Sequence, residues 1–272
     1  MPDPFSNMSE AGEAFIDKAV AVLERRAAEP VMVEAVQRYL SALPRENLSR
    51  IVEVGAGSGP IARQIAMWAP HAHILATEPA AGFLSHARKL SAGIDNLTFE
   101  TRDGRALELA AGSQDFVVMH ALLSHVYDPG EFLAEVYRVL RAEGWLVVFD
   151  GDFAKASLEN ILGDPLGACR EYFQHNFVTD PFVCTGLPEL STTAGFEVSD
   201  FWMIPRLNRD DDGMRPWVEF TTGLMVERDQ ICSELAQGLL AEYDRRREKG
   251  SLSGVQTYAT LIARKPVETG NA

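Results

Sequence analysis

The sequence predicts an α/β protein whose core is a seven-stranded, mostly parallel sheet with helices on both faces. A short β-branched run at 51–54 leads into three glycines at 55, 57 and 59, and a helical pattern of apolar residues begins at Ile61. Strand, glycine turn and helix form the entry of a nucleotide-binding βαβ unit. Further strand-like runs follow, and the 46% hydrophobic content of the 272 residues is ample for a buried core.

Five strands are expected at short intervals, and two more in the last third of the chain. They are placed at 51–54, 72–77, 97–101, 115–120, 145–149, 197–204 and 255–263. The fourth run, Asp115–His120, is apolar through its middle, which is typical of a strand buried on both faces. A helix with one apolar face is expected at 131–141, closed by Gly144.

Helical segments outside this core are expected to shape a site. Residues 1–47 are predicted to form an N-terminal helical cap, with two helices inside 9–42, and 48–272 to form the main domain. Insertions at about 151–185 and 209–250 have helical, aromatic-rich character. They interrupt the fold beside the carboxyl ends of the strands, where ligands bind in open α/β sheets, so we expect a helical lid. Later helices are placed at 188–194, 215–224 and 226–249.

The spacing of the glycines separates two kinds of nucleotide site. The dinucleotide fingerprint G-x-G-x-x-G would place its third glycine at position 60, where the sequence has Pro60. Here the third glycine comes one residue earlier, and Glu53 precedes the loop. Glu78 lies 19 residues after Gly59, at the end of the second predicted strand. An acidic residue there is placed to accept hydrogen bonds from ribose hydroxyls.

Five ordered motifs between about 48 and 152 resemble those of the class I S-adenosylmethionine (SAM)-dependent methyltransferases, in particular the ubiquinone/menaquinone-type enzymes. The motifs are EVGAGSG at 53–59, EPA at 78–80, RDGRAL at 102–107, SHVYDP at 124–129 and EVYRVLRAEG at 135–144. Ser124 replaces the first His of the family pattern, and Ala142-Glu143-Gly144 replaces Pro-Gly-Gly. Neither departure affects the cofactor residues. The resemblance implies a Rossmann-like fold and SAM as the cofactor.

The resemblance also implies a set of cofactor-binding residues near the strand ends. They are Glu53, Gly55, Ala56, Gly57, Gly59, Glu78, Pro79, Phe83, Arg102, Asp103, Gly104, His120 and Ala121. Within this set, Glu53 is expected to hold the amino end of the cofactor, Glu78 the ribose and Asp103 the adenine amino group. His120 is expected to contribute a backbone contact.

The catalytic and acceptor-binding residues are less well defined by the sequence. His125 follows the fourth strand and is the candidate general base for an acceptor that starts protonated. Asp150 and Asp152 follow the fifth strand, and Tyr172 and His175 share one helix face in the first insertion. These four side chains are the candidates for contact with the acceptor.

Charge and composition narrow the range of partners. The net charge of −14 disfavours nucleic acid, whose binding depends on neutralising phosphates. The three cysteines lack metal-site spacing, which suggests free thiols in a reducing compartment without a metal centre or a disulfide frame. With no visible secretory leader and no apolar run long enough for a membrane helix, a cytoplasmic protein without a membrane partner is expected. Homodimer formation is left open.

The leading interpretation is a SAM-dependent methyltransferase that acts on a small, largely apolar metabolite, since acidic charge is combined with two aromatic-rich insertions. The sequence does not decide whether an oxygen, nitrogen, sulfur or carbon atom is methylated. One alternative is a SAM-binding enzyme of another reaction type, such as a cyclase or decarboxylase. A nicotinamide oxidoreductase is opposed by the glycine spacing, and a non-catalytic SAM-binding protein by the intact motifs.

Overall fold

The computed structural model describes residues 3–267 and contains one seven-stranded sheet with the order β3-β2-β1-β4-β5-β7-β6. The strands are β1 (Arg50–Val54), β2 (His73–Thr77), β3 (Leu97–Glu100), β4 (Gln114–His120), β5 (Leu140–Ser157), β6 (Glu197–Asn208) and β7 (Gly254–Arg264). The strand pairs β3–β2, β2–β1, β1–β4 and β4–β5 are parallel. Strand β7 is antiparallel to both β5 and β6. The predicted mostly parallel sheet is therefore confirmed.

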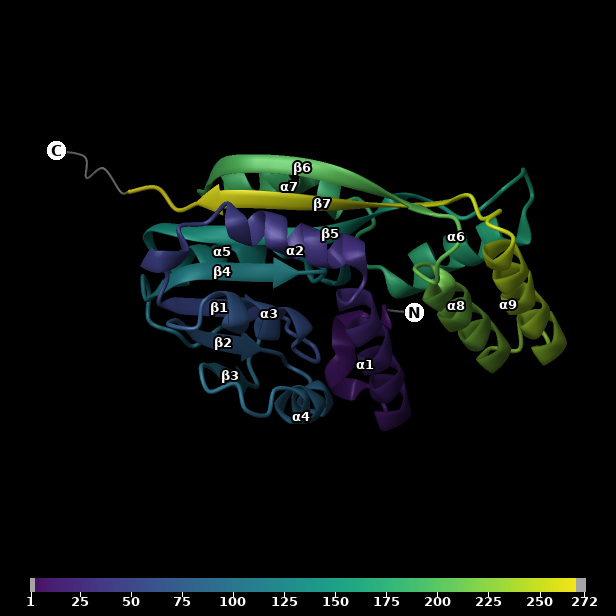
Figure 1. The fold of residues 1–272 in the computed structure, drawn as a ribbon, viewed down its shortest axis with the longest axis horizontal. Coiled ribbons are helices and arrows are strands. Elements are labelled where there is room, and N and C mark those ends of the chain that lie inside the picture. The colour runs from purple at the N-terminus through teal and green to yellow at the C-terminus, as the bar shows by residue number, and fades with distance from the viewer. Residues whose placement is uncertain (1–2, 268–272) are drawn as a thin grey trace.

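Helices cover both faces of the sheet (Figure 1). The longer ones are α1 (Glu13–Ala27), α2 (Pro30–Ser41), α3 (Pro60–Trp68), α4 (Ala81–Leu90), α5 (Pro129–Val139), α6 (Pro165–Phe177), α7 (Val183–Thr193), α8 (Arg215–Glu227) and α9 (Ser233–Glu248). Short 3-10 turns are η1 (Pro4–Glu10), η2 (Arg45–Asn47) and η3 (Leu123–His125). Apolar residues of α2, α3 and α4 pack on one face of the sheet, and those of α5 and α7 on the other.

The alternation of side chains along β4 shows why this sheet forms a two-sided core. Phe116 and Val118 belong to the cluster under α2 and α3, whereas Val117 and Met119 belong to the cluster under α5. All four are fully buried. Successive strand side chains point to opposite faces, so an uninterrupted apolar run requires cover on both sides. The sequence expectation for this strand is confirmed.

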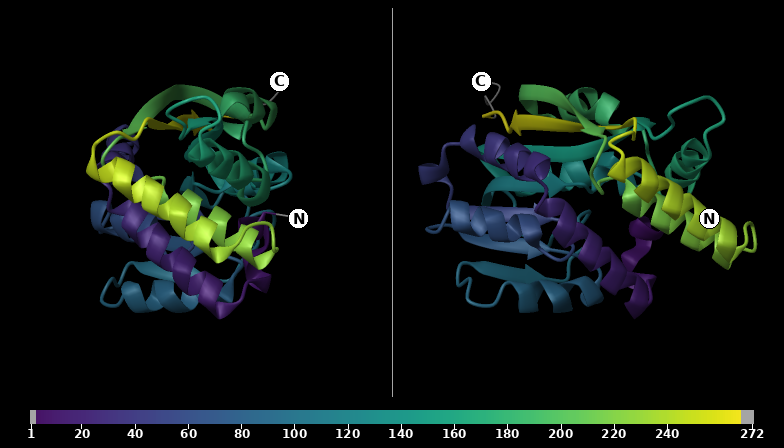
Figure 2. Two further views of the ribbon diagram at one scale, coloured as in Figure 1. Left: turned by 90° about the vertical axis from the view of Figure 1, so that its right-hand side faces the viewer. Right: turned by 45° about the vertical axis from the view of Figure 1, so that its right-hand side comes forward.

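A second group of helices lies beyond the end of the sheet towards which β1, β2 and β4 point. Figure 1 shows α1, α6, α8 and α9 gathered there, and the two views of Figure 2 show the same grouping. Phe15 of α1 and Phe220 of α8 are in ring contact, with centroids 5.8 Å apart. The Lys18 ammonium lies 4.6 Å from the centroid of the same Phe220 ring. The N-terminal segment and the second insertion therefore meet at this end of the molecule.

Several predicted boundaries were wrong, and pairing between distant segments explains the largest error. The helical character expected from residue 151 is absent over 151–157, where β5 continues beside β7, with Gly151 opposite Tyr258 and Asp152 opposite Thr257. The helix expected from Pro188 begins five residues earlier, at Val183. The helix expected at 226–249 is two elements, since α8 ends at Glu227 and α9 begins at Ser233. The 3-10 turn η1 was not predicted.

Candidate active site

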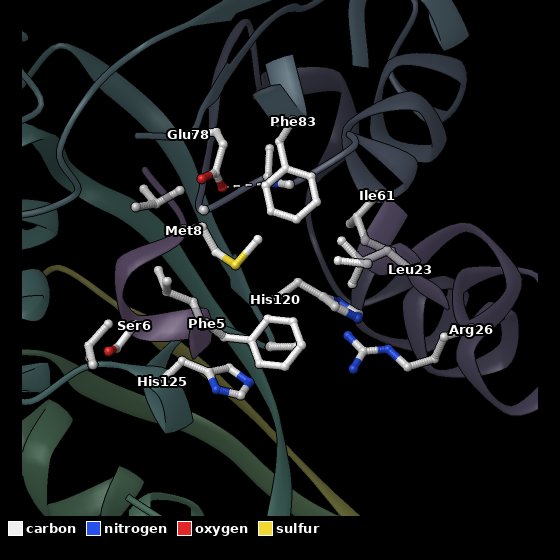
Figure 3. A pocket seen from close by; sticks show the side chains of 18 of the residues that line it. Phe5, Ser6, Met8, Leu23, Arg26, Ile61, Glu78, Phe83, His120 and His125 are labelled. Carbon is white, nitrogen blue, oxygen red and sulfur yellow. Dashed lines mark hydrogen bonds between the residues drawn. The ribbon is translucent and has the colours of Figure 1, made fainter. Parts of the chain in front are cut away.

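A cavity of about 460 Å³ lies at the carboxyl ends of β1, β2 and β4. Its walls come from the glycine loop after β1, from the segments that follow β2, β3 and β4, and from η1, α1 and α8 (Figure 3). The carboxyl edge of a parallel sheet is where open α/β proteins bind their ligands. The volume lies in the range of small-molecule pockets.

The glycine loop approaches the cavity with its backbone alone. Gly55 and Gly57 have φ values of +74° and +54°, which side-chain-bearing residues rarely adopt. A Cβ on Gly55 would lie 2.8 Å from Leu122, and one on Gly57 would lie 2.9 Å from Leu23. Both glycines and Ala56 line the cavity. The loop is fixed from below, because the amides of Gly55 and Ala56 each donate to the Thr77 carbonyl at 2.9 Å.

Gly59 has a different place in the structure from the other two loop glycines. It caps α3 with a φ of +78°, and a Cβ there would lie 2.7 Å from the Phe99 ring. Gly59 is not among the residues that line the cavity. Gly59 allows the turn into α3, and it therefore supports the glycine loop on the side away from the cavity.

Glu53, at the end of β1, brings a buried carboxyl group to the cavity. The residue is 1% exposed, and Oε2 has no hydrogen-bond partner among the described residues. Burial raises the pKa of Glu53 to about 8, an effect that the Ala62 amide and Arg63 oppose and Glu78 increases. Buried polar atoms are normally paired. A cationic group in the cavity would give this carboxylate the partner that it lacks.

Glu78 joins the end of β2 to the glycine loop. Its Oε2 accepts a hydrogen bond from the Gly57 amide at 3.1 Å, and its Oε1 accepts one from the Ala80 amide at 3.0 Å. Burial raises the pKa of Glu78, although both amides oppose the shift. Each carboxylate oxygen has a second lone pair, so two further donors can be accepted. Pro79 and Phe83 line the wall beside it.

The segment after β3 closes the cavity on another side. Gly104 is packed so tightly that a Cβ would lie 2.5 Å from Phe132 and 2.6 Å from Val54. Asp103 lines the cavity, and its Oδ2 accepts a hydrogen bond from Arg105 Nη2 at 2.7 Å. That hydrogen bond holds the pKa of Asp103 below its usual range. Arg102 does not line the cavity, because its guanidinium binds Glu100 and the Leu107 carbonyl.

His120 and Ala121, at the end of β4, line the floor of the cavity. The His120 ring is stacked on Phe149 with centroids 4.3 Å apart, and its Nδ1 lies 3.4 Å from the Tyr39 hydroxyl. Burial, with a smaller effect from Arg26, lowers the pKa of His120 well below 6.5, so the ring is neutral at pH 7. Ala121 has a φ of +56°, and its amide donates to the Phe149 carbonyl at 2.7 Å. A left-handed non-glycine residue is a strained arrangement of the kind that clusters at functional sites.

The four residues expected to contact an acceptor lie outside the cavity lining, whereas His125 is part of it. Asp150 is buried and binds the Ser124 hydroxyl at 2.7 Å and the Ser124 amide at 3.1 Å. Asp152 is fully buried, with Oδ2 at 3.0 Å from Lys155 Nζ. The Tyr172 hydroxyl lies at 2.7 Å from Gln230, and His175 binds its own helix at the Glu171 carbonyl.

Other side chains that line the cavity were not among the predicted site residues. An aromatic wall is formed by Phe5, Phe153, Phe173, Trp217 and Phe220. Figure 3 shows the guanidinium of Arg26 pointing towards the His120 ring, and no hydrogen bond or ion pair among the described side chains engages it. The pair Arg25-Arg26 in the last turn of α1 was the signal available for this residue.

The fold and this cavity define a Rossmann-like α/β protein with a nucleotide-type site. Residues 52–148 match the family model described as "Methyltransferase domain". Demethylmenaquinone methyltransferase of Clavibacter sepedonicus is 32% identical over 99 residues, which cover 36% of this chain and 40% of that protein. Malonyl-[acyl-carrier protein] O-methyltransferase of Hahella chejuensis is 30% identical over 119 residues, 43% of this chain and 42% of that protein. Residues 52–148 are thus similar to a methyltransferase domain.

A solved structure extends the likeness of the fold beyond the matched domain. Phosphoethanolamine N-methyltransferase 2 of Haemonchus contortus matches with a TM-score of 0.61 over 97% of this chain and 59% of that chain, at 14% identity. The chain spans 40–55% of the length of the curated relatives that it matches. Within residues 3–267, no helix combines the length and apolar character needed to cross a membrane.

Proposed function

We propose that the chain uses SAM to methylate a small, largely apolar metabolite in the cavity at the carboxyl ends of β1, β2 and β4. The observation that carries this proposal is the unpaired, buried Oε2 atom of Glu53 beside a glycine loop that presents only backbone, in one cavity with an aromatic wall. When bound, SAM supplies a methyl group made electrophilic by its sulfonium. The chain's residues hold that group, align the acceptor and exclude water.

The polar residues around the cavity fit the parts of SAM. Glu53 offers its unpaired oxygen to the ammonium group, and Arg26 offers a counter-charge to the carboxylate. The free lone pairs of Glu78 suit the two ribose hydroxyls. Asp103 and Gly104 lie where we expect the adenine, and the backbone of His120 and Ala121 forms the floor.

The aromatic wall supports an apolar acceptor. The Phe173 and Trp217 rings are stacked with centroids 4.7 Å apart, and Phe153 lies 5.4 Å from Trp217. Rigid aromatic walls with a few polar groups are the usual lining of small-molecule sites. With a net charge of −14, the protein as a whole would also repel polyanions. Free thiols at all three cysteines support a reducing, cytoplasmic setting.

The test is incubation of the purified chain with methyl-labelled SAM and fractionated metabolite extracts, read by mass spectrometry. We expect a labelled product one methyl group heavier than its precursor, together with S-adenosylhomocysteine. The Glu53→Gln variant should lose most of this activity, and Glu100→Gln should keep it, because Glu100 lies at the end of β3 and is not part of the cavity lining. Rearranged but unmethylated metabolites would instead support a cyclase, and label in tRNA or rRNA would overturn the proposal.

A further inference from the structure

An aspartate from the N-terminal segment lies against the histidine at the cavity wall. His125 Nδ1 is 2.8 Å from Asp3 Oδ2, and the two residues are 122 positions apart in the chain. The side chain of Asp3 is 2% exposed and that of His125 is 16% exposed. This is therefore a nearly buried pair, unlike the exposed ion pairs elsewhere on the surface.

Asp3 is held in place by further hydrogen bonds. Its Oδ1 accepts a hydrogen bond from the Phe5 amide at 2.8 Å, and this hydrogen bond caps η1. Its Oδ2 accepts a hydrogen bond from the Thr179 hydroxyl at 3.2 Å. An ionised carboxylate only accepts hydrogen bonds. The hydrogen between Asp3 and His125 must then reside on Nδ1, and this tautomer leaves a lone pair on Nε2.

The loop that carries His125 is fixed on its other side. Asp150 binds both the amide and the hydroxyl of Ser124, and the Ser124 carbonyl accepts from the amides of Thr179 and Asp180 at 2.9 and 3.0 Å. The His125 ring packs on Phe5, with centroids 5.2 Å apart. Figure 3 shows this ring beside Phe5 at the cavity wall. No hydrogen bond among the described residues engages Nε2, so this atom is available to a ligand in the cavity.

We propose that Asp3 and His125 form a proton-accepting pair for the acceptor, with His125 as the base and Asp3 as the positioning residue. This inference rests on the proposed function and adds a substrate class: the acceptor enters protonated, as a hydroxyl or an acidic C–H group. Its proton moves to Nε2 of His125, and the released electron pair forms the new bond to the methyl carbon. The pair from the broken carbon–sulfur bond stays on the thioether product. Asp3 stabilises the resulting imidazolium, which returns its proton to water.

The pair also gives the N-terminal segment a role in the site. Asp3 supplies the orienting carboxylate, and Phe5, two residues later, packs on His125 and on Phe220 of α8, 5.9 Å away between centroids. The same short turn therefore places the base and closes the aromatic wall beside it. Precise placement of a base next to the reacting atom is what makes general base catalysis effective.

The first test reads the tautomer of His125 without any substrate. In the ¹⁵N-histidine-labelled 272-residue chain at a pH of about 9, well above the ordinary imidazole pKa, long-range ¹H–¹⁵N spectra should show His125 protonated at Nδ1. His125→Gln identifies the signal. Asp3→Asn offers an amide donor in place of a carboxylate oxygen, so the proton should move to Nε2, as an Asp-to-Asn change does in a catalytic triad. Finding Nε2–H in the wild type, or no change in Asp3→Asn, would overturn the pairing.

The chain offers a matched control for this substitution. Asp17 of α1 pairs with His86 Nε2 at 2.9 Å on the surface, with the Asp17 side chain 57% exposed. Asp17→Asn removes the same charge from another Asp–His pair outside the cavity lining. We expect it to leave the His125 signal and the methylation rate unchanged.

The second test uses an acceptor found in the labelling experiment. Asp3→Asn and His125→Gln should lower kcat by about 10²- to 10⁴-fold, the usual contribution of a general base. The affinity for S-adenosylhomocysteine, measured by calorimetry, should stay unchanged, which excludes simple loss of fold. A kcat of Asp3→Asn equal to that of the wild type would contradict this inference and leave the proposed function standing. Absence of methylation in the wild type would instead count against the proposed function, while the tautomer result would remain readable.

Discussion

Glu78 accepts a hydrogen bond from the backbone amide of Gly57 at 3.1 Å, so the end of β2 and the loop after β1 form one unit. The carboxylate that we propose as the acceptor of the ribose hydroxyls therefore also fixes the backbone of the glycine loop. The Ala80 amide, on the other oxygen, completes the arrangement. Loss of the Glu78 side chain should therefore disturb both the end of β2 and the glycine loop after β1.

Glu78→Ala should weaken binding of S-adenosylhomocysteine while the fold survives. Each buried donor left without a partner costs about 1–3 kcal/mol. We therefore expect Kd to rise by at least about fivefold in calorimetry, since 1.4 kcal/mol corresponds to tenfold. Glu100→Ala is the control, because that carboxylate pairs with Arg102 outside the cavity lining. Equal affinity of Glu78→Ala and wild type would show that the ribose does not lie at β2.

Gly59→Ala should destabilise the protein more than Gly93→Ala. Both glycines have positive φ, +78° and +88°, so each alanine suffers a backbone strain of roughly 1–2 kcal/mol. Only at position 59 would the new Cβ also meet the Phe99 ring, at 2.7 Å; nothing lies within 4 Å at position 93. Urea denaturation of both variants measures the difference. Equal free energies of unfolding would contradict the packing described for α3 and β3.

The pKa of Glu53 predicts how stability depends on pH. Because the folded-state pKa is about 8 and the ordinary value is 4.5, the folded protein binds more protons than the unfolded chain between these values. Stability should therefore fall as pH rises through this window. Glu53→Gln, which stays neutral, should lose less stability between a pH of about 6 and a pH of about 9 in urea denaturation. A steeper loss in the variant than in the wild type would contradict the assignment.

Cofactor binding should also release a proton from Glu53. The cationic ammonium of SAM favours the ionised carboxylate and lowers its pKa, so a proton leaves when binding occurs below a pH of about 8. Calorimetry in buffers of different ionisation enthalpy counts these protons. The Glu53→Gln variant should release fewer protons on binding SAM, and it should bind SAM more weakly than the wild type. Wild-type binding without proton release would show that the ammonium group does not reach Glu53.

The helices α6, α8 and α9 are predicted to act as a lid. They pack mainly on one another, and α6 also packs on β5 and η1, in a cluster that contains Phe173, Trp217 and Tyr243. Their amides should exchange hydrogen faster than those of β1 and β4, and α8 should gain protection when S-adenosylhomocysteine and an acceptor fill the cavity. Exchange as slow as that of the sheet in the free protein would mean a rigid wall.

The sheet was predictable because its signals are local. The run at 51–54 and the apolar centre of β4 each need cover on both faces, and the glycines at 55 and 57 mark the turn that brings backbone to a ligand. The extension of β5 was not predictable, since residues 150–157 include two aspartates, a glycine and a lysine. They are strand only because β7 pairs with them, which is a contact between segments about a hundred residues apart.

The sequence placed Glu53, Glu78 and Asp103 at one edge of the sheet, because each lies at or just after a strand end, and all three line the cavity. Arg102, which was expected beside them, does not line it. The surroundings of the methyl acceptor could not be predicted from the sequence in the same way. Asp150 follows β5 as expected, yet it turns to Ser124 and braces the His125 loop. Asp3 meets His125 only through the three-dimensional path of η1, so no spacing in the sequence marks that pair.

The most direct test of the central claim, that this cavity is a SAM site, is isothermal titration of the purified chain with SAM and, separately, with NADH. We predict that one SAM binds per chain with a Kd below about 1 mM, the upper end of ordinary enzyme affinities for substrates, and that NADH gives no binding heat. Folded protein that gives no binding heat with SAM, or that binds NADH and not SAM, would contradict the claim that this cavity is a SAM site.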